Sequence, residues 1–143
     1  MIICGYQGCG KTTYCKTHNN AVDLDSSMFI KNEGWEIRYV ETAVKISETG
    51  QNVFISAHQA VINYLISQNI FFKLLVPALN AKAWKNRLEF RYNANPTQGN
   101  LNALTDFNNN FEKDMEFYYR LDYPNFTMHA VSAKIVTNIA DFI

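Results

Sequence analysis

The fold is indicated first by residues 1–12, which read MIICGYQGCGKT. Met1–Cys4 is a short apolar run that predicts a buried strand. Gly5–Thr12, the glycine loop, matches the spacing GxxxxGKT, and a helical segment follows from Lys11 to about His18. Glycines at this spacing let successive backbone N–H groups face one anion, and the helix N-terminus adds partial positive charge. A strand, this loop and a helix in succession therefore predict a phosphate cradle.

Outward from the glycine loop, short apolar runs alternate with helical periodicity. Further strands are expected at 21–25, 52–56, 70–76 and 126–130. Further helices are expected at 35–49, 58–68, 81–92, 101–119 and 133–142. This alternation predicts an α/β fold with a mainly parallel five-stranded sheet and helices on both of its faces.

Composition favours one globular domain spanning residues 1–143, because no linker or internal repeat divides the chain. Hydrophobic residues make up 48% of the sequence and charged residues 18%, which argues against disorder. The 13 Lys and Arg balance the 13 Asp and Glu, so the formal net charge of zero gives no sign of a surface that coats nucleic acid. If the protein binds a polyanion, a local site must therefore hold it, because the overall charge does not attract it.

The three cysteines, Cys4, Cys9 and Cys15, are odd in number and irregularly spaced. They predict neither a disulfide framework nor a zinc site, but reduced thiols. No stretch approaches the ~18 apolar residues of a membrane span, and no basic leader opens the chain. We therefore expect a soluble cytoplasmic protein without a membrane partner, and the sequence leaves its oligomeric state open.

With its glycine loop at the start of a short α/β domain, the chain resembles the P-loop nucleoside and nucleotide kinases. This group includes adenylate kinase, shikimate kinase and small bacteriophage-encoded relatives, for which the location is the host cytoplasm. The resemblance implies a three-layer P-loop fold, with ATP and Mg²⁺ as cofactors. In the motif, Lys11 reaches the β and γ phosphates as a catalytic residue, and the Thr12 hydroxyl ligates Mg²⁺. The residues expected to bind ATP are Gly5, Gln7, Gly8, Cys9, Gly10, Lys11, Thr12 and Thr13.

Two carboxylates, Asp23 and Asp25, end the second expected strand, and residues two apart on a strand share a face. The pair resembles the Asp-x-Asp of shikimate kinase, which implies that Asp23 supports Mg²⁺ through water and that Asp25 meets the acceptor hydroxyl. The alternative is a helix cap or turn beside Ser26. The strand at 52–56 lacks a Walker B aspartate, so support for the metal falls on Asp23 or Asp25.

The expected helix within about 80–93 carries four basic residues, Lys82, Lys85, Arg87 and Arg91. Arg87 and Arg91 are four residues apart and share one helical face. The helix resembles the short lid of these kinases, which implies that both arginines are catalytic. A planar, permanently charged guanidinium suits the charge that spreads over the transferring phosphoryl group. The alternative is a solvated basic helix face.

Two further residues are candidates for binding the acceptor. Arg38 could clamp a monophosphate bidentately or could be a surface charge. His58 follows the strand at 52–56, at the edge where parallel sheets bind ligands, and could line the pocket or cap the next helix.

The function predicted is ATP- and Mg²⁺-dependent phosphoryl transfer, first to a nucleoside monophosphate, deoxynucleotides included. The alternatives are a kinase of a hydroxyl acceptor (a nucleoside, a polynucleotide 5′ end or a small metabolite) and a non-catalytic nucleotide-binding protein.

Overall fold

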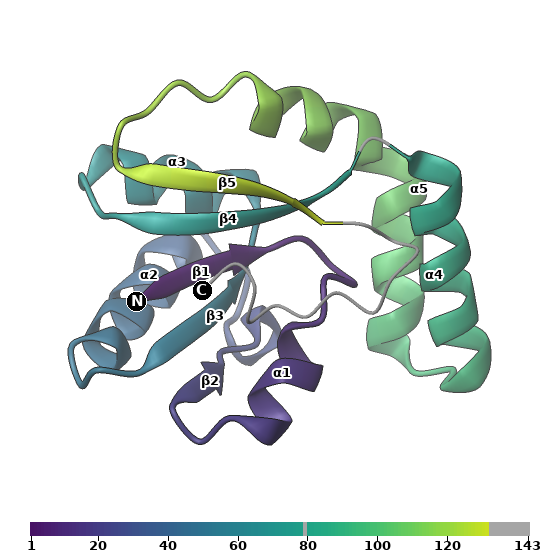
Figure 1. Ribbon diagram of the computed structural model, residues 1–143, viewed down its shortest axis with the longest axis horizontal. Coiled ribbons are helices and arrows are strands. Elements are labelled where there is room, and N and C mark those ends of the chain that lie inside the picture. The colour runs from purple at the N-terminus through teal and green to yellow at the C-terminus, as the bar shows by residue number, and fades with distance from the viewer. Residues whose placement is uncertain (79, 132–143) are drawn as a thin grey trace.

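A computed structural model describes residues 1–78 and 80–131, which form a five-stranded sheet with five α-helices (Figure 1). The strands are β1 (Ile2–Gly5), β2 (Ala21–Asp23), β3 (Asn52–Ser56), β4 (Phe72–Pro77) and β5 (Phe126–Val131). The helices are α1 (Lys11–Thr17), α2 (Trp35–Ser47), α3 (Gln59–Ser67), α4 (Ala81–Ala94) and α5 (Gln98–Tyr119), with a 3₁₀ turn η1 (Ser26–Met28). The predicted α/β class is confirmed, while the helix expected at 133–142 lies outside the described residues.

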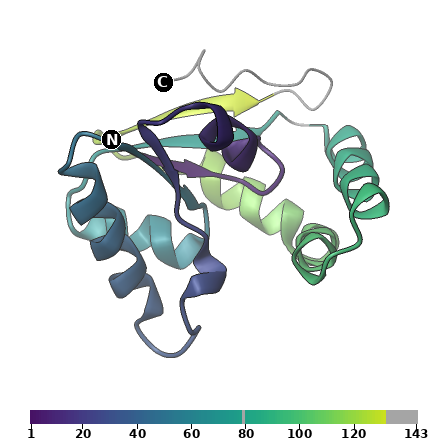
Figure 2. The same ribbon diagram turned by 90° about the horizontal axis from the view of Figure 1, so that it is seen from below.

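The strand order is β2-β3-β1-β4-β5, and every neighbouring pair is parallel. The central strand β1 pairs with β3 and β4, so that Cys4 lies opposite Ile55 and Leu74. Residues of β1 are buried on both faces, as expected for a continuous apolar run. Figure 2 shows α1 on one face and α2, α3 and the C-terminal part of α5 on the other, which is compatible with a three-layer fold.

All five strands run in one direction, so their carboxyl ends meet at one edge of the sheet. The chain leaves β1 towards β2 but leaves β4 towards β5, and the two connections therefore diverge at this edge. Open parallel sheets bind ligands where connections diverge in this way. The glycine loop follows β1 at this point and is joined to β4 by a hydrogen bond of 2.9 Å from the Tyr6 amide to the Leu75 carbonyl.

Helices α4 and α5 pack side by side beyond the carboxyl ends of the strands (Figure 1). Each begins at a residue whose side chain accepts a backbone N–H, Asn80 from Ala83 for α4 and Thr97 from Asn100 for α5. Trp84 anchors α4, because its side chain is fully buried. The helix predicted as a lid is therefore packed onto the domain. No helix within the described ranges is long and apolar enough to cross a membrane.

Candidate functional site

The glycine loop turns sharply between β1 and α1. Gly8 and Gly10 have φ angles of 84° and 102°, in the left-handed region that favours glycine. The Cys9 amide donates to the Tyr6 carbonyl at 3.2 Å and closes the turn. Gly5 has no room for a side chain, because an added Cβ would lie 2.5 Å from the Cys9 Sγ. Such a turn at the start of a helix is a suitable backbone for binding an anion.

Two predicted cradle residues begin α1 and have defined partners. The Lys11 Nζ donates to the Gly5 carbonyl at 2.7 Å, so its side chain folds back across the loop. The Thr12 hydroxyl donates to Asp23 Oδ2 at 2.6 Å. Thr13, also predicted to bind ATP, is exposed on α1. Cys9 is fully buried and fills the space beside Gly5.

The contact between Thr12 and Asp23 places a hydroxyl and a carboxylate at the carboxyl edge of the sheet. Mg²⁺ prefers oxygen ligands of this kind and usually keeps several waters alongside phosphate oxygens. Within residues 1–78 and 80–131, no group of three or more His, Cys, Asp or Glu side chains could hold a metal. The pair therefore fits a Mg²⁺ held together with a bound phosphate, and does not form a metal cage of its own.

Asp25 lies beyond the end of β2, because β2 ends at Asp23 and not at 25 as expected. Its Oδ1 accepts the Ser27 amide at 2.9 Å and caps η1, so the capping alternative is present in the structure. The other carboxylate oxygen, Oδ2, makes no hydrogen bond to any described residue. One oxygen thus remains open to a ligand.

Between the two aspartates, Leu24 is fixed by Tyr39, an aromatic residue that the sequence suggests either for stacking a base or for the core, and not for this hydrogen-bonding role. The Tyr39 hydroxyl of α2 donates to the Leu24 carbonyl at 2.6 Å and accepts the Ser56 amide at 2.8 Å. Tyr39 is fully buried, and burial raises the pKa of its hydroxyl. An aromatic residue on the apolar face of a helix signals packing or stacking of its ring, and gives no sign of the bonds that its hydroxyl makes.

His58 occupies the N-cap position of α3, but its side chain does not cap the helix. Its Nε2 lies 3.4 Å from the Ser26 hydroxyl, and its ring meets the ring of Trp35 edge-on at 5.3 Å. Desolvation of the imidazole, followed by the positive charge of Lys31, lowers the pKa of His58, and the negative charge of Asp106 opposes this effect in part. The neutral imidazole is therefore favoured next to the predicted acceptor site.

Arg38 is exposed and engaged with its own surroundings. Its Nη2 donates to the Ile30 carbonyl at 3.2 Å and to Asn32 Oδ1 at 2.7 Å. These bonds brace the loop between η1 and α2. The structure thus gives Arg38 a local partner set beside the acceptor edge, in keeping with the surface-charge alternative.

The two lid arginines have different surroundings. The guanidinium of Arg87 lies 5.3 Å from the centre of the Trp84 ring, a cation–π arrangement. Burial is the main reason that the pKa of Arg87 is lowered, and Cys9 of the glycine loop is within electrostatic range. Arg91 is exposed. Of the two arginines, Arg87 is the one linked to the glycine loop, through Trp84, whose indole N–H is bonded to the Gln7 carbonyl.

Gln7 of the glycine loop is bound to α5, a contact that the sequence analysis did not predict. Its Nε2 donates to Asp106 Oδ2 and to the Ala103 carbonyl, both at 2.9 Å. The second oxygen of Asp106 accepts from Asn110 Nδ2 at 2.7 Å. The carbonyl of Gln7 accepts the indole N–H of Trp84 at 3.0 Å. Gln7 is therefore held by α4 and α5 together.

A partly buried polar stripe runs along α5, made of Asp106, Asn110 and Asp114 at four-residue spacing. Asp114 Oδ1 accepts the side-chain amide of Gln59, at the start of α3, at 3.0 Å. Burial raises the pKa of Asp114, and the nearby charge of Asp106 adds to the effect. This spacing among apolar residues is a sequence signal that could have identified the stripe.

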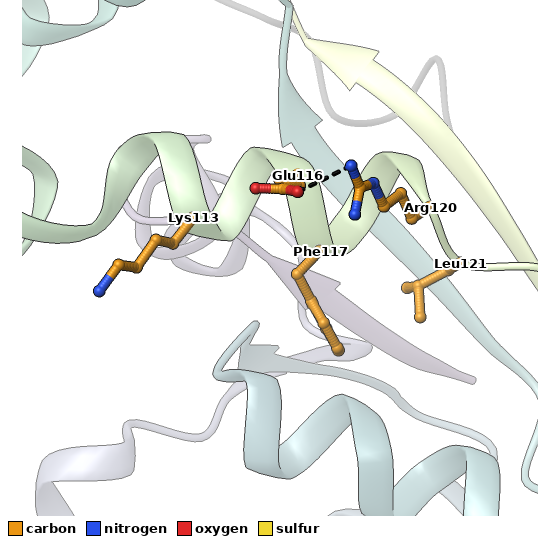
Figure 3. A pocket seen from close by; sticks show the side chains of 5 residues that line it. All are labelled: Lys113, Glu116, Phe117, Arg120 and Leu121. Carbon is orange, nitrogen blue, oxygen red and sulfur yellow. Dashed lines mark ion pairs between the residues drawn. The ribbon is translucent and has the colours of Figure 1, made fainter.

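A separate hollow lies on the C-terminal turns of α5 (Figure 3). It is lined by Lys113, Glu116, Phe117, Arg120 and Leu121. Glu116 and Arg120, on neighbouring turns of α5, form an exposed ion pair at 2.8 Å (Figure 3). No residue of the glycine loop lines the hollow, so it is distinct from the candidate site.

No protein-family model matches this chain, and no curated protein matches it. The functional reading consequently depends on the geometry of the site. The described residues bring Thr12 to Asp23 and place Arg87 against the Trp84 ring, whose indole N–H is bonded to Gln7 of the glycine loop. They leave Arg38 and Arg91 exposed.

Proposed function

We propose that this protein is an ATP- and Mg²⁺-dependent phosphotransferase built on a P-loop kinase-like domain. The observation that carries the proposal is the hydrogen bond between Thr12 and Asp23, directly behind the glycine loop. The hydroxyl at the Thr12 position of this motif is a Mg²⁺ ligand in P-loop enzymes. Asp23 supplies, from the neighbouring part of the sheet, the carboxylate that the end of β3 lacks.

The residues of the site would contribute mainly by positioning and by stabilising charge. The glycine-loop amides and Lys11 bind the β and γ phosphates, and Lys11 exchanges its bond to the Gly5 carbonyl for the phosphate oxygens. Arg87 stabilises the charge that develops on the transferring group. Thr12 and Asp23 would hold Mg²⁺, which would supply charge neutralisation for the phosphate oxygens.

The first acceptor that we propose is a nucleoside monophosphate, for which Arg38 would bind the acceptor phosphate. A second candidate, a hydroxyl-bearing acceptor, is favoured by a specific observation. Arg38 is held by the Ile30 carbonyl and Asn32, whereas Asp25 keeps one oxygen open to receive a hydroxyl proton. In this second reaction the acceptor oxygen bonds to the γ phosphorus, the bond to ADP breaks, and the proton passes to Asp25.

The test is ATP consumption with Mg²⁺ across ribo- and deoxynucleoside monophosphates, nucleosides and a 5′-hydroxyl oligonucleotide. Lys11→Ala is the control that removes the cradle charge. Turnover with one acceptor class that is lost in Lys11→Ala is the expected result. Loss with Arg38→Ala but not with Asp25→Ala identifies a phosphate acceptor, and the reverse identifies a hydroxyl acceptor. Tight ATP binding with no turnover on any acceptor would instead establish a non-catalytic nucleotide-binding protein.

A further inference from the structure

Gln7 is held, through its side chain and its main chain, by two helices that come much later in the chain. Its side-chain amide is bound to Asp106 and to the Ala103 carbonyl on α5. Its main-chain carbonyl accepts the Trp84 indole N–H from α4. Because both ends of the residue are held, the loop at Gln7 and Gly8 cannot turn independently of α4 and α5.

Side-chain packing ties α4 to the same point. A Cβ added to Gly8 would lie 3.0 Å from Leu88 Cδ2 and 3.5 Å from Trp84 Nε1. Both Trp84 and Leu88 are buried, with 0% and 1% of their surface exposed. The Tyr6 ring also meets the Trp84 ring edge-on, with centroids 6.2 Å apart. Helix α4 thus lies directly on the backbone of the glycine loop.

Arg87 follows Trp84 by about one helical turn, and its guanidinium lies 5.3 Å from the centre of the indole ring. A planar cation over an aromatic face loses fewer degrees of freedom on meeting a phosphate than a free surface arginine does. The direction of the Trp84 ring is itself set by its hydrogen bond to Gln7. A continuous set of contacts therefore joins Asp106, Gln7, Trp84 and Arg87.

We propose that Trp84 is a positioning residue for the γ-phosphate: its N–H bond to the Gln7 carbonyl fixes the ring on which Arg87 lies, next to the glycine loop, and Asp106 anchors Gln7 for this purpose. This inference rests on the proposed function. It explains why a polar glutamine in the loop and a buried aromatic on α4 are linked by a hydrogen bond. It also assigns to Trp84 a consequence that core packing alone does not have, a selective contribution to binding the triphosphate over the diphosphate.

The experiment is calorimetric titration of the folded protein with Mg²⁺·ADP and with a non-hydrolysable Mg²⁺·ATP analogue. The variants are Trp84→Phe, Arg87→Ala, their combination, and Trp35→Phe as the matched control on the acceptor side. Loss of one hydrogen bond predicts about 3- to 10-fold weaker binding of the analogue by Trp84→Phe. ADP binding should change less than about twofold, since ADP lacks the γ-phosphate that Arg87 contacts. Arg87→Ala should show the same selectivity, and the double variant should show no further selective loss.

Equal weakening of both nucleotides by Trp84→Phe would overturn the positioning role and leave the proposed function standing. Selective losses that add in the double variant would overturn the claim that Trp84 acts through Arg87. A wild-type protein that binds neither nucleotide would overturn the proposed function and this inference together.

A second pair of variants decides the question if Trp84→Phe does not fold. Asp106→Ala removes one of the two α5 acceptors of the Gln7 side-chain amide and leaves the Ala103 carbonyl, whereas Asp106→Asn keeps an oxygen that can accept the same N–H. Selective loss of triphosphate binding in Asp106→Ala, with recovery in Asp106→Asn, supports the inference. If Asp106→Ala and Asp106→Asn bind the ATP analogue with the same affinity and bind ADP with the same affinity, the inference is contradicted.

Discussion

Replacement of Tyr39 by phenylalanine removes one oxygen from the core while leaving the ring in place. That oxygen has two partners, the Leu24 carbonyl at 2.6 Å and the Ser56 amide at 2.8 Å. Both partners are backbone groups that would lose their bond to this hydroxyl. Leaving a buried polar group unsatisfied costs about 1–3 kcal/mol, so we expect the free energy of unfolding to fall by about 2–6 kcal/mol.

The assay is urea unfolding followed by fluorescence, with the free energy of unfolding extrapolated to water. Tyr119→Phe is the matched control, because the hydroxyl of Tyr119 makes one bond, to the Pro77 carbonyl at 3.1 Å, and 39% of the residue is exposed. Its replacement should lower the free energy of unfolding by about 0.5–1.5 kcal/mol, the usual net value of one hydrogen bond.

A loss in Tyr39→Phe no larger than that in Tyr119→Phe would refute the reasoning. It would mean that water or a small backbone shift satisfies Leu24 and Ser56 without the tyrosine. It would also remove the basis for treating Tyr39 as the residue that fixes the position of the two aspartates.

Three further predictions concern packing and titration. Gly5→Ala should lower the free energy of unfolding by about 1–3 kcal/mol in urea titrations, because the added Cβ would lie 2.5 Å from the Cys9 Sγ. Adding Cys9→Ala to the same chain should recover part of this loss. An equal loss from Gly5→Ala with and without Cys9 would contradict the contact. Asp114→Asn should raise the melting temperature at pH 7. Burial raises the pKa of Asp114 in the folded state, so ionisation of this carboxyl lowers the stability as the pH rises, and asparagine avoids this cost. The gain in melting temperature should disappear below the ordinary aspartate pKa of about 3.9. The pKa of Cys15 is raised by burial to about 11, so about one thiol in a thousand is ionised at pH 8. Alkylation by iodoacetamide, followed by mass spectrometry, should therefore be slow at pH 8 and about tenfold faster per pH unit up to pH 10; modification at the rate of an unperturbed thiol would contradict this.

Most of the elements could be predicted because each depends on local periodicity. The structure differs from the prediction at the ends of elements, where single hydrogen bonds determine at which residue an element begins or ends. The second strand ends at Asp23 because Asp25 turns to cap η1. Helix α5 begins at Gln98, three residues earlier than expected, because the Thr97 hydroxyl accepts the Asn100 amide. These bonds join residues only two or three positions apart, and they move the ends of the elements away from where the pattern of apolar residues predicts them.

The candidate site was predictable only in part. The spacing of the glycine loop is a local signal, and the Asp-x-Asp pattern singled out Asp23, whose side chain accepts a hydrogen bond from Thr12 in the structure. The roles of Tyr39, Gln7 and Asp106 could not be read from the sequence, because each depends on a contact between elements far apart in the chain. The sheet order, which places β1 at the centre, likewise depends on packing between distant segments.

The central place of β1 has a consequence for biosynthesis. This strand leaves the ribosome before both of its partners, β3 and β4, and β4 begins only at Phe72. At about 5–20 residues per second, translation from Gly5 to Phe72 takes about 3 to 13 s. During this interval Ile2, Ile3 and Cys4 have no strand on the β4 side to pair with, and an apolar strand with an unpaired edge is prone to aggregation.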